Sequence, residues 1–158
     1  MGNAHEEWMR QAIALAVENV QKGRGGPFGA VVVKDNQVIA TGVNSVTAMH
    51  DPTAHAEVLA IRNACAKLKA FQLTDCDLYS SCEPCPMCLG AIYWARPRAY
   101  YFACTRESAA EAGFDDSYIY EQLTLKPEQR SIPGHCVTID RASAPFVEWA
   151  QSVQKIRY

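Results

Sequence analysis

Apolar residues near the start of the chain recur three and four positions apart, a spacing that predicts an amphipathic helix from His5 to Gln21. The apolar positions of this segment are Met9, Ala12, Ile13, Ala16, Val17 and Val20. The segment from Gly23 to Pro27 should end the helix, because glycine and proline both disfavour its continuation. A helix with one buried stripe therefore comes first.

Two short apolar runs follow this helix. They span 28–33 and 38–43 and are rich in β-branched residues, while the polar segment 34–37 between them is typical of a turn. We therefore expect two paired strands.

A second helix is predicted over 54–68. The residues Asp51-Pro52-Thr53 before it are typical of a helix entrance, and strong helix formers fill the segment itself. This interpretation places His55 and Glu57 in the first turn of the helix.

The middle of the chain predicts a strand, a helix and a strand in close succession. They cover Cys76–Ser80, Pro86–Ala95 and Ala99–Ala103, and proline is well suited to the first position of a helix. Such an order suggests a parallel crossover. Beyond it we expect helices over 106–112, 117–125 and 144–155, and a weak strand near 136–139. The whole chain, 1–158, is interpreted as one α/β domain with helices on both faces of a mixed sheet.

Composition narrows the functional classes. Of the 158 residues 49% are hydrophobic and 20% are charged, which is the balance of a globular protein, and the formal net charge is −2. The broad positive field that attracts nucleic acid is therefore missing, although a local basic patch is not excluded. No stretch predicts a secretion signal or a membrane span, so we expect a cytoplasmic protein with no membrane partner.

Seven cysteines are an odd number for a disulfide framework. In a reducing compartment, clustered cysteines more often bind metal. Cys85 and Cys88 stand two residues apart around the start of a predicted helix, and His55 lies 30 positions before Cys85. One histidine and two thiolates supply the three protein ligands of a catalytic zinc site and leave a fourth position open for water.

Glu57 completes the chemistry that this ligand set predicts. Zinc lowers the pKa of a bound water to about 7, and a carboxylate beside it can take up and return protons. A purely structural site has no use for such a carboxylate. We therefore expect His55, Cys85 and Cys88 to hold one zinc ion per chain and Glu57 to transfer protons.

Other interpretations of the cysteines stay open. Cys82 extends the motif to C-x-x-C-x-x-C, so it can replace Cys85 as a ligand or belong to a structural zinc or iron–sulfur site, although Cys104 is distant as a fourth ligand. Cys65, Cys76, Cys104 and Cys136 carry no pairing pattern and are expected to be small buried residues. A non-catalytic zinc-binding protein is the competing functional class.

The H-x-E and P-C-x-x-C motifs form the signature of the zinc-dependent deaminases. Over nearly its whole length the chain resembles bacterial guanine deaminases of the cytidine deaminase-like superfamily. The resemblance rests on residues 25–30, Asn44, 51–57, 81–88, 91–95 and 111–117. It implies a three-layer α/β/α fold with a five-stranded sheet, one catalytic zinc and conversion of guanine to xanthine by attack at C2. It also implies a homodimer in which the tail, about 140–158, is swapped between subunits.

The resemblance also implies roles for residues around the zinc. Asn44 would contact the edge of the base, Phe28 and Trp94 would form the pocket walls, Asp116 would meet the purine and its departing amino group, and Tyr158 would cover the site. The alternatives are core aromatics for Phe28 and Trp94, a helix cap for Asp116 and a fraying end for Tyr158.

Rival substrates within the same fold are cytosine, an aminotriazine, guanosine and adenosine in tRNA. The near-neutral charge disfavours tRNA, and the segment around Asp116 disfavours cytosine.

Overall fold

The computed structural model describes residues 4–158 and divides the chain into two compact units. The first unit ends at Asp116 and the second spans Ser117–Tyr158. That both belong to one deaminase domain, with a tail that is swapped between subunits, stays a prediction.

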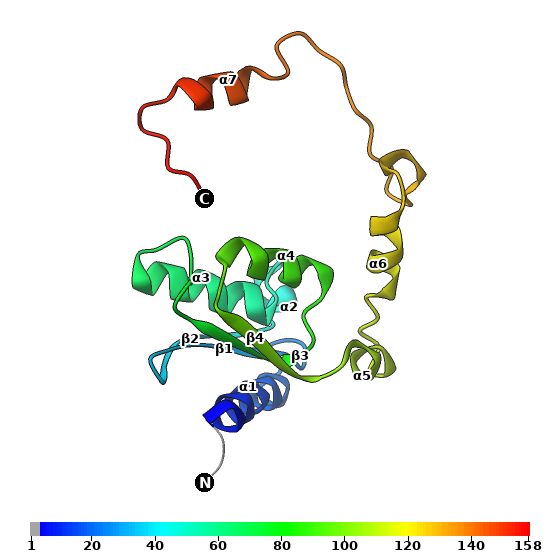
Figure 1. The fold of residues 1–158 in the computed structure, drawn as a ribbon. Helices are drawn as coiled ribbons and strands as arrows, with labels where there is room; N and C mark the ends of the chain where they lie inside the picture. The colour runs from blue at the N-terminus through cyan, green and yellow to red at the C-terminus, as the bar shows by residue number, and fades with distance from the viewer. Residues whose placement is uncertain (1–3) are drawn as a thin grey trace. The chain divides into compact units, whose positions relative to one another are not determined.

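A four-stranded sheet forms the centre of the first unit (Figure 1). Its strands are β1 (Gly29–Lys34), β2 (Gln37–Val43), β3 (Asp77–Cys82) and β4 (Ala99–Cys104), in the order β2-β1-β3-β4. β1 pairs antiparallel with both β2 and β3, whereas β3 and β4 are parallel. The expected hairpin and the parallel crossover are both confirmed.

Helices cover both faces of this sheet (Figure 1). Helix α1 (Ala4–Gln21) packs on β1 and β3 from one side, and α3 (Ala56–Leu68) packs on β1 and β2 from the other, beside α4 (Pro86–Ala95). β1 and β3 are buried almost throughout because each lies between two helical layers. A short helix α2 (Val46–Met49), which the sequence did not predict, follows β2, and α5 (Arg106–Glu111) follows β4.

Side chains alternate between the two faces of β3 and β1. Ala30, Val32 and Leu78 belong to the core cluster under α3 and α4, whereas Val31 and Tyr79 belong to the cluster under α1. The sheet therefore supports two separate cores, one on each face.

The expected five-stranded sheet is wrong for the residues that the structure describes. Residues 135–139, which supplied the predicted strand near Cys136–Ile139, have no regular secondary structure. They lie in the second unit, whose described elements are α6 (Ser117–Thr124), the 3-10 helix η1 (Pro127–Gln129) and α7 (Ala144–Gln151). A strand needs a neighbouring strand for its backbone hydrogen bonds, and this unit offers none among its described residues.

Within residues 4–158, no helix has both the length and the apolar composition needed to cross a membrane.

Candidate active site

His55 lies immediately before helix α3 rather than in its first turn, where the sequence placed it. Its backbone is extended, with φ −74° and ψ 155°, and the helix begins at Ala56. The Asp51 carboxylate accepts hydrogen bonds from the backbone N–H and the hydroxyl of Thr53, at 2.8 and 2.7 Å, and so fixes the turn that leads to this point. The imidazole therefore projects from the helix end.

Cys85 occupies the same position before helix α4. Its backbone is also extended, and Pro86 begins the helix, as predicted. Cys88 follows in the first turn and is fully buried. The first turn thus brings both sulfur atoms to the amino end of α4, where helix amide groups favour thiolates.

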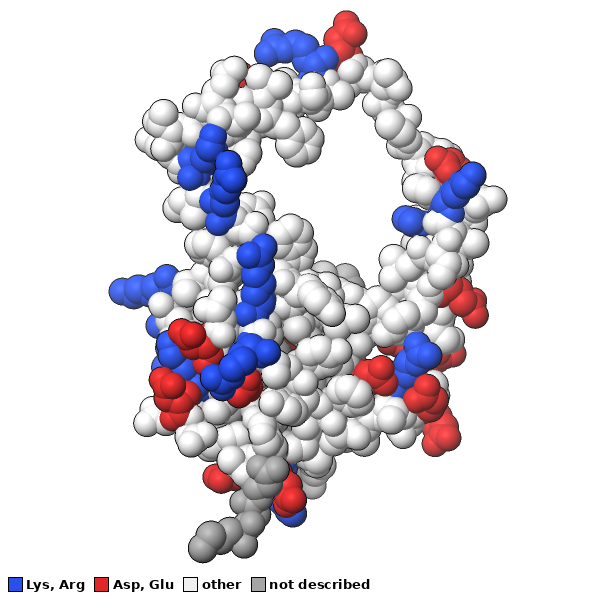
Figure 2. All heavy atoms as spheres, viewed as in Figure 1, with Lys and Arg blue, Asp and Glu red and all other residues white. Residues whose placement is uncertain are grey.

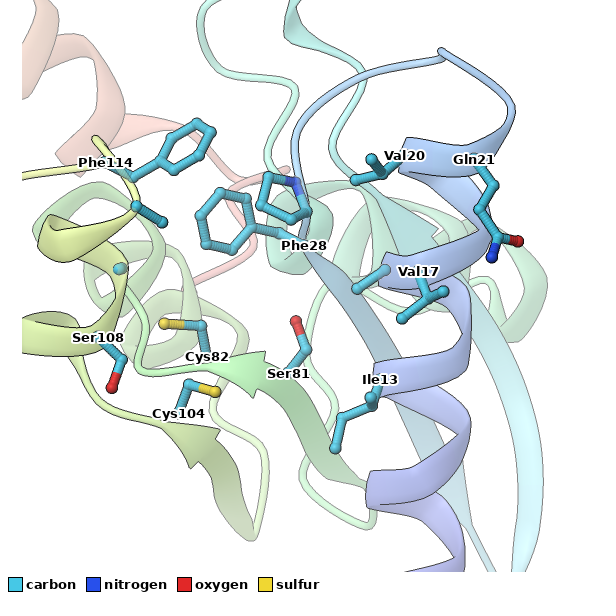
Figure 3. Close-up of a pocket in the computed structure, with 14 residues that line it drawn as sticks. Ile13, Val17, Val20, Gln21, Phe28, Ser81, Cys82, Cys104, Ser108 and Phe114 are labelled. Carbon is cyan, nitrogen blue, oxygen red and sulfur yellow. The ribbon is translucent and has the colours of Figure 1, made fainter.

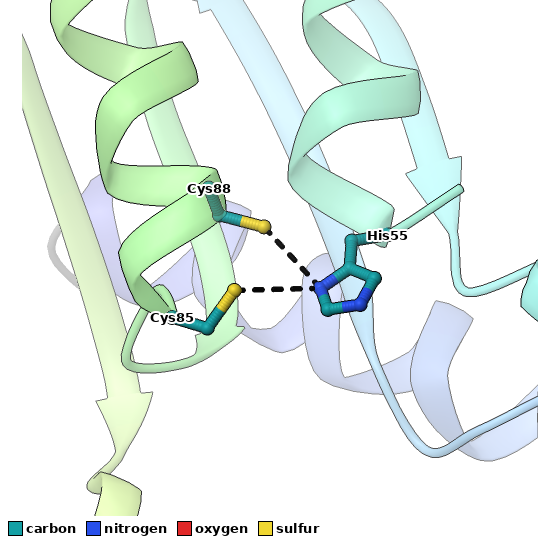
Figure 4. A group of neighbouring side chains, drawn as sticks. All are labelled: His55, Cys85 and Cys88. Carbon is teal, nitrogen blue, oxygen red and sulfur yellow. Dashed lines mark hydrogen bonds between the residues drawn. The ribbon is translucent and has the colours of Figure 1, made fainter. Parts of the chain in front are cut away.

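The three side chains meet at one point (Figure 4). Nδ1 of His55 lies 3.5 Å from Sγ of Cys85 and 3.4 Å from Sγ of Cys88, and the three candidate ligand atoms all lie within 4.8 Å of one another. Zinc bonds of about 2.1 Å to nitrogen and 2.3 Å to sulfur, at tetrahedral angles, require such atoms to be about 3.6 Å apart. The donor set and its spacing therefore fit a zinc ion.

Cys85 and His55 shift each other's pKa in opposite directions. Hydrogen bonds from Cys88 and from His55 lower the pKa of the Cys85 thiol to about 4, in spite of its burial. The hydrogen bond to Cys85, together with the charges of Cys85 and Glu57, raises the pKa of His55. This shift favours the protonated imidazole, so zinc has to displace a proton to bind Nδ1. A thiolate is the form of cysteine that binds zinc.

Glu57 lies beside the cluster in the first turn of α3 and is only 5% exposed. Burial raises the pKa of its carboxyl group. Its Oε2 accepts a hydrogen bond from Sγ of Cys88 at 3.3 Å, and its Oε1 accepts one from Oγ of Ser80 at 2.8 Å. The carboxylate thus borders the cluster without belonging to the ligand set.

Cys82 lies at the end of β3 and does not join the ligand cluster among the described residues. Its Sγ donates to the backbone carbonyl of Thr105 at 3.6 Å. Burial raises the pKa of its thiol to about 11, so it is a poor thiolate. Of the cysteines expected to be buried, Cys76 is buried and Cys65 half-buried, whereas Cys104 and Cys136 are exposed, against the prediction.

Asn44 is buried at the end of β2, where its Oδ1 accepts a hydrogen bond from the Gly26 amide at 3.2 Å. Among the described residues, its Nδ2 has no hydrogen-bond partner, so this donor remains available to a ligand. A Cβ at Gly25 would lie 2.1 Å from the Asn44 carbonyl oxygen. Glycine at that position is therefore required for the two backbones to come so close.

Phe28 is half-buried, and its ring meets the edge of the Phe114 ring at a centroid distance of 5.0 Å. The two rings border an apolar cavity of about 460 Å³ that also reaches Val17 and Cys82 (Figure 3). The residues lining this cavity do not include the three candidate ligands. Phe28 therefore faces a neighbouring apolar space.

The remaining predicted residues are more exposed. Trp94 is 64% exposed near the end of α4, and Asp116 is half-buried at the end of the first unit. Burial and the nearby charge of Cys85 raise the pKa of Asp116. Tyr158, the last residue of the second unit, is 70% exposed.

Comparison with known proteins supports the same chemistry. Residues 2–104 match the family described as the cytidine and deoxycytidylate deaminase zinc-binding region. Guanine deaminase of Bacillus subtilis (strain 168) is 56% identical over 98% of this chain and 99% of its own length. A tRNA-specific adenosine deaminase of Buchnera aphidicola subsp. Schizaphis graminum is 37% identical over 87% of this chain and 91% of its own.

A solved structure extends the likeness to the fold. The X-ray structure of guanine deaminase from Bacillus subtilis superimposes with a TM-score of 0.97 at 55% identity, over 100% of this chain and 99% of that one. The fold, the geometry of the ligand cluster and these matches together show that the chain belongs to the zinc-binding cytidine and deoxycytidylate deaminase family.

Proposed function

We propose that this protein is a zinc-dependent guanine deaminase, a hydrolase that converts guanine and water into xanthine and ammonia. The observation that carries the proposal is the cluster of His55, Cys85 and Cys88 beside the buried carboxylate of Glu57. The choice of guanine is supported by the 56% identity to a guanine deaminase, which extends over both units of the chain.

A zinc ion on the three ligands would supply a nucleophilic water at neutral pH. Glu57 accepts a proton from the attacking water and gives it to a ring nitrogen as oxygen adds to C2. It then accepts the proton of the new C2 hydroxyl group and gives it to the departing amino group. Burial raises the pKa of the Glu57 carboxyl group toward neutral pH. A pKa nearer to neutral pH suits a group that both accepts and donates protons. Ammonia leaves and the C2 carbonyl of xanthine remains.

The residues around the cluster are proposed to hold the purine. Asn44 contacts the base edge through its Nδ2, while its Oδ1 stays on the backbone of Gly26. Phe28 and Trp94 form apolar walls for a flat base. Asp116 is the second proposed catalytic residue and binds the purine and its departing amino group. The negative charge of its carboxylate stabilises the amino group as that group gains a proton.

We also propose a homodimer in which the tail, about 140–158, crosses to the partner subunit and Tyr158 covers the purine. The apolar residues of the second unit support this arrangement, because most of them are exposed in the single chain. They include Leu123, Ile132, Phe146, Trp149 and Val153. An apolar surface of this kind is usually covered by another chain.

Substrate choice is tested by ammonia release from the purified zinc-loaded protein with guanine, guanosine, adenine, cytosine, an aminotriazine and an adenosine-containing tRNA. We expect guanine to give the highest kcat/KM. Figure 2 shows Asp and Glu beside many, though not all, of the Lys and Arg side chains on one face. The formal net charge of −2 disfavours a nucleic-acid substrate. A higher kcat/KM for any other member of the panel would contradict the assignment.

A further inference from the structure

The two carboxylate oxygens of Glu57 have different neighbours. Oε2 points to the ligand cluster and lies 3.3 Å from Sγ of Cys88. Oε1 accepts a 2.8 Å hydrogen bond from the hydroxyl of Ser80, a residue that is only 1% exposed. The side chain is therefore held by one oxygen and presents the other to the metal ligands.

Ser80 owes its position to the alternation of β3. Its neighbours Leu78 and Ala30, the latter opposite it on β1, belong to the apolar core under α3 and α4. Tyr79 points to the opposite face, under α1, where its hydroxyl lies 2.8 Å from Nδ1 of His5. Ser80 thus places a hydroxyl beside these apolar side chains, and that hydroxyl donates to Glu57.

Metal binding should make this hydrogen bond more important. Cys88 carries no thiol proton when its sulfur is a thiolate ligand, so it can no longer donate to Oε2. Among the described residues, Ser80 is then the side-chain donor that remains on the carboxylate.

We propose that Ser80 is a positioning residue for the deamination proposed above. Its hydroxyl fixes Oε1 on the sheet and turns Oε2 toward the ligand cluster, so that Oε2 is the oxygen that exchanges protons with water and purine. The hydrogen bond of 2.8 Å to Ser80 and the contact of 3.3 Å with Cys88 place the two oxygens in different surroundings. The expected change in kcat rests on the proposed function. The expected orientation of the Glu57 carboxylate does not.

The kinetic experiment compares Ser80→Ala with Ser80→Thr. The alanine variant removes the donor, and the threonine variant retains a hydroxyl in a residue suited to a strand. We expect Ser80→Ala to lower kcat for guanine by about 10- to 100-fold. A misplaced Glu57 carboxylate slows the chemical step but does not weaken substrate binding. KM and zinc content should stay within about twofold of the wild type. Ser80→Thr should recover most of kcat.

Tyr79→Phe is the matched control. It removes a buried hydroxyl from the neighbouring position of the same strand, but on the face away from Glu57. We expect its melting temperature to fall about as far as that of Ser80→Ala while its kcat stays within about twofold of the wild type. A kcat loss equal in both variants would assign the effect to the strand and overturn the proposal. So would full activity of Ser80→Ala, or a folded Ser80→Thr that is as slow as the alanine variant.

A crystal structure of zinc-loaded Ser80→Ala tests the orientation without any substrate. The proposal predicts that the Glu57 carboxylate turns away from its wild-type position or occupies more than one conformer. An unchanged, single conformer would overturn it. If the wild type deaminates none of the bases tested but Glu57 turns in this variant, the proposed function fails and the positioning role stands.

Discussion

Nδ1 of His55 lies 3.4 Å from Sγ of Cys88, although 33 positions separate the two residues. Their helices, α3 and α4, lie side by side on one face of the sheet with their amino ends together (Figure 4). The cluster is thus formed by two helix starts, and the sheet that carries both helices fixes its spacing.

Removal of one ligand should release the metal. We expect Cys85→Ser to bind less than about a tenth of the zinc of the wild type, because a hydroxyl is a poor zinc ligand in place of a thiolate. Cys82→Ser is the control and should keep one zinc per chain, since the Cys82 sulfur contacts the Thr105 carbonyl instead. Metal analysis after dialysis measures both. Zinc loss in Cys82→Ser with retention in Cys85→Ser would show that the ligand set is wrong.

Asp116 should matter for turnover and not for zinc. Asp116→Asn removes a negative charge that is proposed to meet the purine, and we expect kcat/KM for guanine to fall about 10- to 100-fold at unchanged zinc content. Asp115→Asn changes the neighbouring, exposed carboxylate and should stay within about threefold of the wild type. Steady-state kinetics of both variants decide the point. Equal effects would indicate a general electrostatic influence rather than a contact.

Removal of residues 156–158 tests the proposed cover over the purine. Ile156 and Tyr158 are 65% and 70% exposed in the single chain, so their loss should change the melting temperature by no more than about 2 °C. We nevertheless expect kcat/KM for guanine to fall at least about tenfold, because a cover excludes water from the reaction. Full turnover of the truncated chain would rule out this role for Tyr158.

Much of the site could be predicted from the sequence because its signals are local. A proline after Cys85 marks a helix start, and the spacing to Cys88 brings both sulfurs to one turn. His55 and Glu57 are close in sequence, and the structure places both at the amino end of α3. The predicted start of the helix was wrong, because the turn held by Asp51 delays the helix to Ala56.

The remaining features depend on contacts that no local pattern contains. In the sequence, Ser80 has no feature that distinguishes it from other strand residues. Its hydrogen bond to Glu57, 23 positions earlier in the chain, appears only in the folded structure. The apolar residues near Val137 have the composition of a strand, but a strand forms only where another can pair with it. Cys104 resembles a buried residue in the sequence, yet it is exposed beside the apolar cavity.

In the proposed reaction, a zinc ion on His55, Cys85 and Cys88 works together with the Glu57 carboxylate. The most direct test is the rate of xanthine formation from guanine by Glu57→Gln, measured at a zinc content matched to the wild type. The amide retains the shape of the side chain but cannot exchange protons, so kcat should fall at least about 100-fold while one zinc per chain remains bound. A variant that retains both its zinc and the wild-type rate would contradict the account.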